Sequence, residues 1–417
     1  MKKFLLKIIY VLYAFLAKTY IRRHKPIVIG ITWSVWKTSC RMVIFQVFKQ
    51  LLEGKNIYTS PKNFNSELGL VFSIFKLEEY NPWIKSLIKI FFKFLRKAFF
   101  WKKEYDILVL EYWVDHPWDM DFLLKIVKPD YSIFTKLDYI HVENFSSKKE
   151  IWEEKIKLIE NTKIKAYLNK QDEFLKDSKK SLNVDSSFFN KKWELKYKYI
   201  CEWKWIKSVI KSDNNVVKTN IMWEDNFVYL ALALKILKKF DVDYVENGTF
   251  IKLINQPWRF ELFNWITKSV LIDSSYNAWP ASMLKMIENT NELKKNIFKK
   301  YKILFVVWDM RELWKRSKTE HRKLYAYLKS YWEIISVWEE TKKYFGTHLW
   351  NFKYSKDAWT FLKTYLKKSN NKYLILFKWS QTNIYTEEAI KQVLENNKNE
   401  DKLVRQEYHW LEKKQTY

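Results

Sequence analysis

Short apolar runs rich in β-branched residues alternate along this chain with longer segments whose apolar residues recur at helical spacing. In the first half, buried strands are predicted at 27–32, 105–112, 130–135 and 165–168, and helices at 39–53, 149–160 and 226–240. After Gly248 the pattern begins again, with strands predicted at 269–272, 302–307, 334–337 and 373–377. Strands that alternate with helices are typical of mostly parallel sheets, so the predicted fold class is α/β.

The restart of this pattern suggests how the chain is organised. We expect an N-terminal amphipathic helix at 1–25, a first α/β domain at 26–250 and a second at 251–417. Residues 174–220 are weakly patterned and rich in lysine, and we assign them to the sheet edge of the first domain.

Two segments combine apolar residues with a regular supply of basic ones. In the first, the apolar run at 8–17 is too short to span a bilayer easily, so we expect a helix that packs on the domain, with a membrane surface as the alternative. The second is an amphipathic insertion at 83–100, in which lysine recurs every four residues, at Lys85, Lys89, Lys93 and Lys97. Such a stripe fits a peripheral helix on an anionic membrane, or a helix packed on the protein with its lysines in water.

The amino-acid composition limits the classes of partner that we expect for this chain. The 417 residues include 75 Lys and Arg against 47 Asp and Glu, a formal net charge of +28, but the lysines are spread along the chain without a nucleic-acid-binding motif. We therefore expect no nucleic-acid partner. Two cysteines cannot build a disulfide framework, which favours a reducing, cytoplasmic compartment. The count of 5 Gly against 22 Trp excludes collagen-like and glycine-rich disordered classes.

The strongest chemical signal follows the first strand. Strand 27–32 runs into TWSVWKTS (32–39) and then into a helix, which is the context of a phosphate-binding loop. In such a loop Lys37 would reach the β- and γ-phosphates and Thr38 would bind Mg²⁺. The backbone must also curl around the phosphates, which requires glycine where Trp33 and Trp36 stand. Either the Lys-Thr pair is a coincidence, or tryptophan stands in glycine positions.

Reading tryptophan as glycine turns this segment into GITGSVGKTS, which resembles the loop of the Mur ligases. The same change gives family-like motifs at 111–120 (EYGVDHPGDM), 221–226 (IMGEDN), 256–261 (QPGRFE), 306–314 (VVGDMRELG), 337–340 (VGEE) and 377–382 (FKGSQT). The segment DSSYNAWPASM at 273–283 is similar to the pattern D-D-x-Y-N-A-N-P-x-S-M of the MurF type. The resemblance covers about residues 26–410.

A reassigned codon is the simplest explanation of these tryptophans. Some bacteria read UGA as glycine, and translation of their genes with a table that reads UGA as tryptophan would place Trp at a subset of Gly positions. The alternative is a decayed paralogue, but random decay should not choose tryptophan repeatedly. As printed, Trp33 and Trp36 are expected to crowd the nucleotide site.

The resemblance implies an ATP-dependent ligase of peptidoglycan synthesis. A P-loop ATPase domain would be followed by a Rossmann-like C-terminal domain, and the substrates would be ATP, UDP-MurNAc-tripeptide and D-Ala-D-Ala. ATP would phosphorylate the tripeptide carboxylate, and the dipeptide amine would attack the acyl phosphate. The alternatives are another Mur-type ligase with a different carboxylate substrate, and a non-catalytic basic protein of Mur-like fold that binds a membrane or nucleic acid. We expect a monomer.

The resemblance also implies roles for single residues. The catalytic residues would be Lys37, Glu111, His141 and Lys155, and the ligands of Mg²⁺ would be Thr38, Glu111, His141 and Lys155, the last after carbamoylation. The nucleotide would be bound by Gly30, Thr32, Trp33, Ser34, Trp36, Lys37, Thr38, Ser39, Asn169, Asn226, Arg259 and Asp273. The other substrates would be bound by Asn63, Asn65, Asn277, Lys378 and Ser380. Members of this type carry a UDP-binding domain before the phosphate loop, where only about 25 residues stand here, so UDP recognition is expected to be rebuilt or supplied elsewhere.

Overall fold

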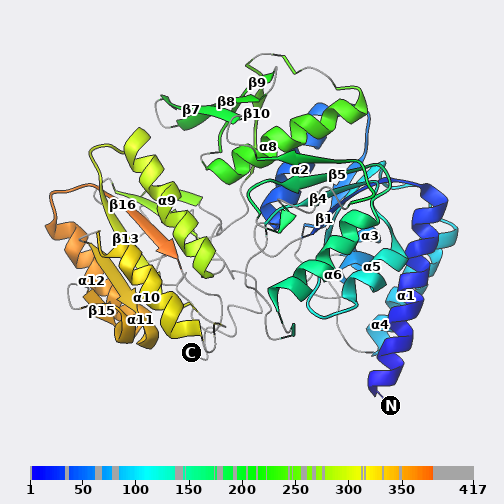
Figure 1. Ribbon diagram of the computed structural model, residues 1–417, viewed down its shortest axis with the longest axis horizontal. Helices are drawn as coiled ribbons and strands as arrows, with labels where there is room; N and C mark the ends of the chain where they lie inside the picture. The colour runs from blue at the N-terminus through cyan, green and yellow to red at the C-terminus, as the bar shows by residue number, and fades with distance from the viewer. Residues whose placement is uncertain are drawn as a thin grey trace. The chain divides into compact units, whose positions relative to one another are not determined.

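The computed structural model divides into two compact units, Met1–Leu253 and Ile254–Tyr417 (Figure 1). The residues that it describes are 2–32, 37–61, 68–77, 84–136, 144–145, 147–172, 174–175, 182–190, 195–202, 205–212, 215–221, 223–242, 245–246, 248–254, 261–264, 269–274, 278–310, 313, 316–330, 333–346 and 350–378.

A six-stranded parallel sheet in the order β2-β3-β1-β4-β5-β6 forms the centre of the first unit. Its strands are β1 (Ile27–Thr32), β2 (Ile57–Thr59), β3 (Ile107–Tyr112), β4 (Tyr131–Phe134), β5 (Lys165–Asn169) and β6 (Ser186–Phe189). The α/β prediction is confirmed, because β1, β3, β4 and β5 are the four predicted strands of this half. Successive residues of β1 point to opposite faces: Val28 joins one apolar core and Ile29 the other.

Helices cover both faces of this sheet (Figure 1). The helices of this unit are α1 (Lys2–His24), α2 (Lys37–Leu51), α3 (Gly69–Ile74), α4 (Ile84–Phe99), α5 (Asp119–Ile126), α6 (Lys148–Glu160), α8 (Glu224–Leu237) and the short 3-10 helix η2 (Lys238–Phe240). The core on one face contains residues of α2 and α8, and the core on the other contains residues of α1, α3, α4, α5 and α6.

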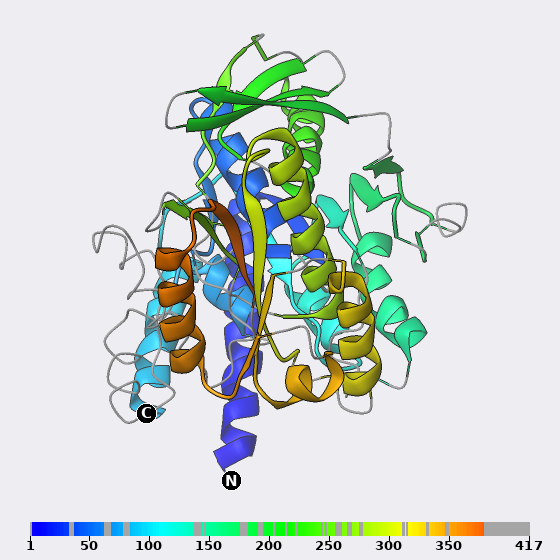
Figure 2. The same ribbon diagram turned by 90° about the vertical axis from the view of Figure 1, so that its left-hand side faces the viewer.

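A second, four-stranded sheet corrects the assignment of residues 174–220. Among the described residues of that stretch, β6 extends the main sheet, while β7, β8 and β9 belong to a separate sheet with the order β10-β9-β8-β7 (Figure 2). Its strands are β7 (Leu195–Glu202), β8 (Trp205–Ser212), β9 (Asn215–Thr219) and β10 (Phe250–Ile251). Antiparallel hairpins with one covered face need apolar residues only at alternate positions, as in LKYKYICE, so their strands read as weakly patterned.

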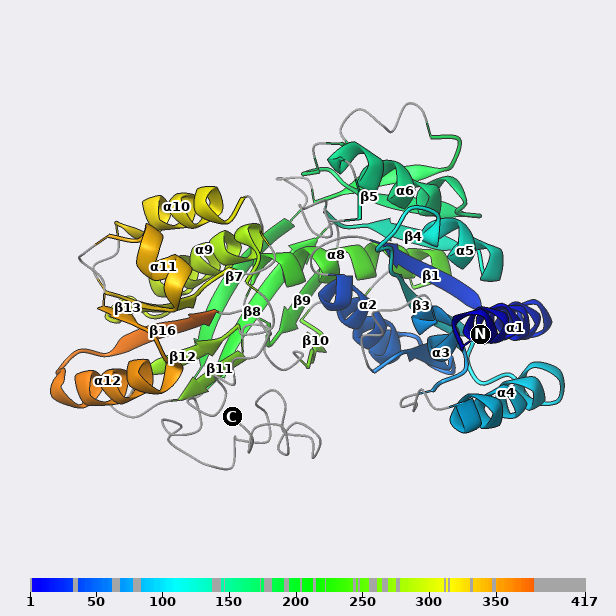
Figure 3. The ribbon, with the colours of Figure 1, turned by 90° about the horizontal axis from the view of Figure 1, so that it is seen from below.

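The second unit repeats the α/β plan. Its sheet has the order β11-β12-β16-β13-β14-β15, in which β11 is antiparallel to β12 and the other pairs are parallel. In Figure 3, α9 and α10 lie on one side of this sheet and α12 on the other. The elements are β11 (Glu261–Asn264), β12 (Val270–Asp273), α9 (Pro280–Asn296), β13 (Lys302–Trp308), α10 (Ser317–Leu328), β14 (Ile334–Val337), α11 (Glu339–Tyr344), β15 (Trp350–Phe352), α12 (Ser355–Lys368) and β16 (Tyr373–Lys378).

The two basic amphipathic segments form α1 and α4, which pack on the first unit. Tyr13 and Tyr20 of α1 are fully buried in the core. The single lysine stripe expected on α4 is wrong, because Lys97 turns inward and pairs with Glu104 at 2.9 Å, while Lys89 lies in solvent. A spacing of four residues advances 400° around a helix, so the stripe drifts by about 40° at each step. Within the described part of the chain, no helix has the length and apolar character needed to cross a bilayer.

Two tryptophans adopt backbone conformations that L side chains avoid. Trp118, just before α5, has φ 77° and ψ −5°, the values that a type II turn requires of glycine or asparagine. Trp338, just before α11, has φ 91° and ψ −178°, a region that is essentially restricted to glycine. Both positions were among those at which the sequence suggested glycine.

Candidate active site

The candidate site lies at the carboxyl edge of the first sheet, where β1 and β3 end side by side. Their parallel register pairs Ile31 with Glu111 and Thr32 with Tyr112. Ligands of open α/β sheets bind at this edge. The chain leaves β1 through 33–36, which lies outside the described residues, and α2 begins at Lys37 and Thr38. The phosphate-loop lysine and the carboxylate of Glu111 are therefore carried by neighbouring elements.

Lys37 is buried at the start of α2, with only 6% of its surface exposed. Burial lowers its pKa to about 8, and the charges of Glu111 and Asp115 oppose that change. Its ammonium nitrogen lies 3.9 Å from the centre of the Trp113 ring, a cation–π contact. The lysine is thus held away from bulk water beside two carboxylates.

Glu111 is paired with a residue that the sequence analysis missed. Arg41, one turn after Lys37 on α2, is 2% exposed, and its Nε lies 2.9 Å from Glu111 Oε1. Its Nη1 donates to Thr59 Oγ1 at 3.1 Å and to the carbonyl of Ser60. The available signal was a cation four residues after Lys37, on the same helix face and among apolar residues.

Lys155 of α6 reaches the same neighbourhood. It is 2% exposed, and its pKa is well below the usual value, first because of burial and then because of the positive charge of Lys37, with Asp115 acting in the opposite direction. Lys37 and Lys155 therefore share Asp115 as a counter-charge. A lysine whose charged form is penalised in this way has more of the neutral, nucleophilic amine than an exposed lysine.

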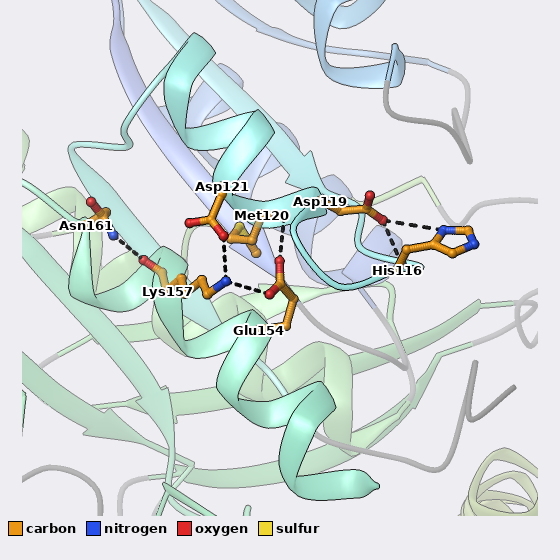
Figure 4. A network of polar contacts seen from close by, with 7 residues as sticks. All are labelled: His116, Asp119, Met120, Asp121, Glu154, Lys157 and Asn161. Carbon is orange, nitrogen blue, oxygen red and sulfur yellow. Dashed lines mark hydrogen bonds and ion pairs between the residues drawn. The ribbon is translucent and has the colours of Figure 1, made fainter. Parts of the chain in front are cut away.

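A polar network joins α5 to α6 next to this site (Figure 4). Glu154, the residue before Lys155, accepts the backbone N–H of Met120 at 2.9 Å and pairs with Lys157 at 2.6 Å. Lys157 also pairs with Asp121 at 2.6 Å. Asp119 Oδ2 accepts the backbone N–H groups of Asp115 and His116, which fixes the loop that carries Asp115.

The second unit has its own pair of predicted residues. Asp273 ends β12 and Lys378 ends β16, and these strands are parallel neighbours. Asp273 is 1% exposed and Lys378 is 5% exposed, and Lys378 Nζ donates to the carbonyl of Ser274 at 3.0 Å. Both residues thus lie at the carboxyl edge of the second sheet, the edge at which ligands of open α/β sheets bind.

Comparison with known proteins now bears on this arrangement. Residues 31–226 match the protein family described as the Mur ligase middle domain. This segment contains Lys37, Glu111 and Lys155 as well as the sheet that positions them.

Residues 31–226 are therefore similar to a Mur ligase middle domain.

Proteins that match a larger part of the chain are also Mur ligases. The chain is 23% identical over 315 residues to the UDP-N-acetylmuramoyl-tripeptide–D-alanyl-D-alanine ligase of Bacillus subtilis (strain 168); this covers 74% of the chain but only 61% of that protein. The fold is similar to the MurF ligase of Thermotoga maritima in complex with ADP, with a TM-score of 0.72, 21% identity and coverage of 94% and 84% of the two chains. It is also similar to MurF of Acinetobacter baumannii, with a TM-score of 0.72, 18% identity and coverage of 91% and 79%.

The remaining described residues of the predicted Mur ligase site are mostly engaged in local structure. A Cβ atom on Gly30 would lie 2.9 Å from the Tyr112 ring, so this glycine allows close packing beneath the site. Asn169 Oδ1 accepts from Gln171 N at 3.0 Å and from Asn190 Nδ2 at 3.1 Å. The other three are Thr32, whose hydroxyl faces the carbonyl of Tyr112, Ser39 in the first turn of α2, and Asn226, buried in the first turn of α8.

Nine predicted site residues lie outside the described residues. Their roles stay predictions, and so does the expected crowding by the two loop tryptophans. They are Trp33, Ser34, Trp36, Asn63, Asn65, His141, Arg259, Asn277 and Ser380.

Proposed function

We propose that this chain is an ATP-dependent amide-bond ligase that joins D-Ala-D-Ala to a UDP-MurNAc-tripeptide. The observation that carries the proposal is the convergence of Lys37, Glu111 and Lys155 at one sheet edge, in a Mur ligase middle domain. The B. subtilis relative is named for this reaction and the T. maritima MurF structure contains ADP, which supports the choice of substrates.

The reaction would proceed in two displacements. A carboxylate oxygen of the tripeptide attacks the γ-phosphorus of ATP and ADP leaves; the dipeptide amine then attacks the acyl carbon, phosphate leaves and the nitrogen loses a proton. Lys37 would neutralise the transferred phosphoryl group. The hydroxyl of Thr38 and the carboxylate of Glu111 are oxygen donors of the kind that Mg²⁺ prefers, and the ion would supply further charge neutralisation. Glu111 would have to leave Arg41 at least in part to bind it.

Lys155 fits the proposed carbamate. Carbamoylation joins the neutral amine nitrogen to the carbon of CO₂, releases a proton and leaves an anion. This modification would turn repulsion between Lys37 and Lys155 into attraction, and it would add carboxylate-like oxygens for the metal.

The proposal also requires glycine in the phosphate loop. A side chain at position 33 or 36 would occupy space that the phosphates need. The ring of Trp113 lies over Lys37, and glycine at 113 would open that space. Trp118 and Trp338 have backbone conformations that favour glycine, which supports a codon reassignment. This support is independent of the phosphate loop, because neither residue belongs to that loop. We therefore propose that UGA encodes glycine at positions 33, 36, 113, 118 and 338.

The decisive experiment uses the full chain with glycine at positions 33, 36, 113, 118 and 338. ADP release should require both UDP-MurNAc-tripeptide and D-Ala-D-Ala, and Lys37→Ala should abolish it. Lys49→Ala, an exposed lysine on the same helix, is the matched control and should retain activity. ADP release only with other carboxylate and amine pairs would reassign the substrate, and the absence of ATP binding would overturn the enzyme assignment.

A further inference from the structure

The outer side of α1 carries a stripe of exposed apolar residues. Ile8, Val11, Leu12 and Phe15 are 42%, 62%, 41% and 58% exposed. Their spacing of three, one and three residues places them on one helix face. The opposite side of the same helix is buried in the core, as Tyr13 shows. Scattered apolar residues are normal on a protein surface, but a contiguous stripe indicates an interaction site.

Helix α4 carries a second stripe of the same kind. Ile88, Phe92 and Phe99 are 50%, 61% and 43% exposed, and Phe100, which follows the helix, is 80% exposed. The spacing of four and seven residues again selects one face. Exposed basic side chains lie between these residues along the helix, namely Lys89, Lys93 and Arg96.

The two stripes lie on the neighbouring helices α1 and α4 (Figures 1 and 3). In the middle of α1, the Tyr13 ring is 5.1 Å from the Phe94 ring of α4, and the Tyr13 hydroxyl donates to the carbonyl of Leu87 in the first turn of α4. At the end of α1, Arg23 Nη1 donates to the carbonyl of Trp101, which follows α4, at 3.0 Å, so the two helices run in the same direction. These contacts place residues 8–15 beside residues 87–94, so the exposed residues of the two stripes lie at the same level along the helix axes.

The positive charge of the two helices indicates which kind of partner binds their exposed faces. Neither α1 nor α4 contains an aspartate or a glutamate, and both contain several lysines and arginines. A second copy of this chain would bring basic face against basic face, which is repulsive. An anionic bilayer offers negative headgroups to the basic side chains and an apolar interior to the phenylalanines.

We infer that the outer faces of α1 and α4 together bind the surface of an anionic membrane. The helices lie in the interface without crossing it, with Phe15 and Phe92 below the headgroups and Lys89 and Lys93 among the phosphates. This inference goes beyond the proposed ligase reaction and does not depend on it. Neither helix contains a tryptophan, so it does not depend on the codon reassignment either.

The test is flotation of the full chain with phosphatidylcholine vesicles that contain or lack phosphatidylglycerol. The protein should float with the anionic vesicles and remain at the bottom with the neutral ones. The variant Val11→Ser, Phe15→Ser, Phe92→Ser and the variant Lys89→Glu, Lys93→Glu should each reduce the floating fraction at least tenfold. Added salt should reduce binding of the native chain, because the attraction between charges is screened.

Matched controls change the same residue types elsewhere on the first unit. Phe250→Ser removes an apolar residue that is 44% exposed, and Lys125→Glu, Lys128→Glu reverses two exposed charges. These controls should float like the native chain. The inference is overturned if the native chain does not float, or if the controls lose binding as the stripe variants do. The inference is also overturned if light scattering shows that the native chain is a dimer and that the stripe variants are monomers.

Discussion

The charge of Lys37 lowers the pKa of Lys155, and both amines are buried beside Asp115. Two buried ammonium groups that share the carboxylate of Asp115 repel each other, which favours loss of a proton from one of them. The pKa of Lys155 lies well below the usual value, first because of burial and then because of the charge of Lys37. In the proposed reaction, Lys37 binds phosphate and Lys155 supplies the nucleophilic amine that forms the carbamate.

The first prediction concerns carbon dioxide. If Lys155 forms a carbamate, ligase activity of the glycine-containing chain falls when CO₂ is removed and returns when bicarbonate is added. Lys155→Ala has little activity under either condition, because it has no amine to react. Lys149→Ala, which replaces an exposed lysine on the same helix, responds to bicarbonate like the glycine-containing chain without this substitution. Incubation with ¹³C-bicarbonate should give a carbamate signal in the NMR spectrum that Lys155→Ala lacks; its presence in both proteins would contradict the assignment.

The second prediction concerns the pH dependence of stability. The pKa of Lys37 is about 8 in the folded chain, and that of an unfolded lysine is about 10.4. Between these values the unfolded chain binds more protons, so the contribution of Lys37 to stability is unfavourable at low pH and rises with pH through this window. At ~1.4 kcal/mol per pKa unit, the full change is about 3 kcal/mol.

Urea unfolding of the native chain and of Lys37→Met between pH 8 and pH 10 measures this effect. The free energy of unfolding should increase more steeply with pH in the native chain than in Lys37→Met. Lys49→Met, which replaces an exposed lysine of α2, should keep the native slope. Equal slopes for all three proteins would show that Lys37 is not the group responsible.

The third prediction concerns the ion pair between buried Arg41 and half-buried Glu111. Arg41→Met leaves the carboxylate of Glu111 without its cation and removes the hydrogen bond to Thr59, so stability should fall by about 3–5 kcal/mol. The double variant Arg41→Met, Glu111→Gln should be less destabilised than Arg41→Met, because no buried charge is left uncompensated. Arg96→Met, which replaces an exposed arginine of α4, should change the free energy of unfolding by less than about 0.5 kcal/mol.

The parts of the fold that the sequence predicted are those with a strong local pattern. Strands such as β1 and β14 are buried on both faces and read as continuous apolar runs, and the structure places them at the predicted residues. The strands β2 and β15 have only three residues each and lie at sheet edges, which is too short for a pattern. The sheet of β7, β8 and β9 alternates polar and apolar residues, and its register depends on pairing with neighbours.

The site shows the same division. Lys37 and Glu111 could be found because they belong to short motifs beside strands. Arg41 and Asp115 were missed, because their importance arises from three-dimensional contacts. Arg41 neutralises Glu111 across two elements, and Asp115 acts on Lys37 and Lys155 from a loop held by Asp119. The direction of Lys97 likewise depends on helix geometry and on Glu104, which lies beyond the end of α4.

The last prediction concerns tryptophans with positive φ. Trp338 and Trp118 hold backbone conformations that cost a residue with a Cβ about 1–3 kcal/mol each, so Trp338→Gly and Trp118→Gly should both raise the free energy of unfolding. Trp359 is the opposite case. It lies in α12, is 1% exposed and stacks on Phe377 with the ring centres 4.7 Å apart. Trp359→Gly should therefore lower the free energy of unfolding by at least about 3 kcal/mol.

Opposite signs at these positions would show that the chain favours glycine where the backbone requires it and not at tryptophans in general. Destabilisation by all three substitutions would mean that tryptophan is the fitting residue throughout. Because unfolding is measured without substrate, the result does not depend on ligase activity. Sequencing the gene gives an independent check: codons 118 and 338 should be UGA, as should codons 33 and 36, where glycine is needed for phosphate binding rather than for a turn.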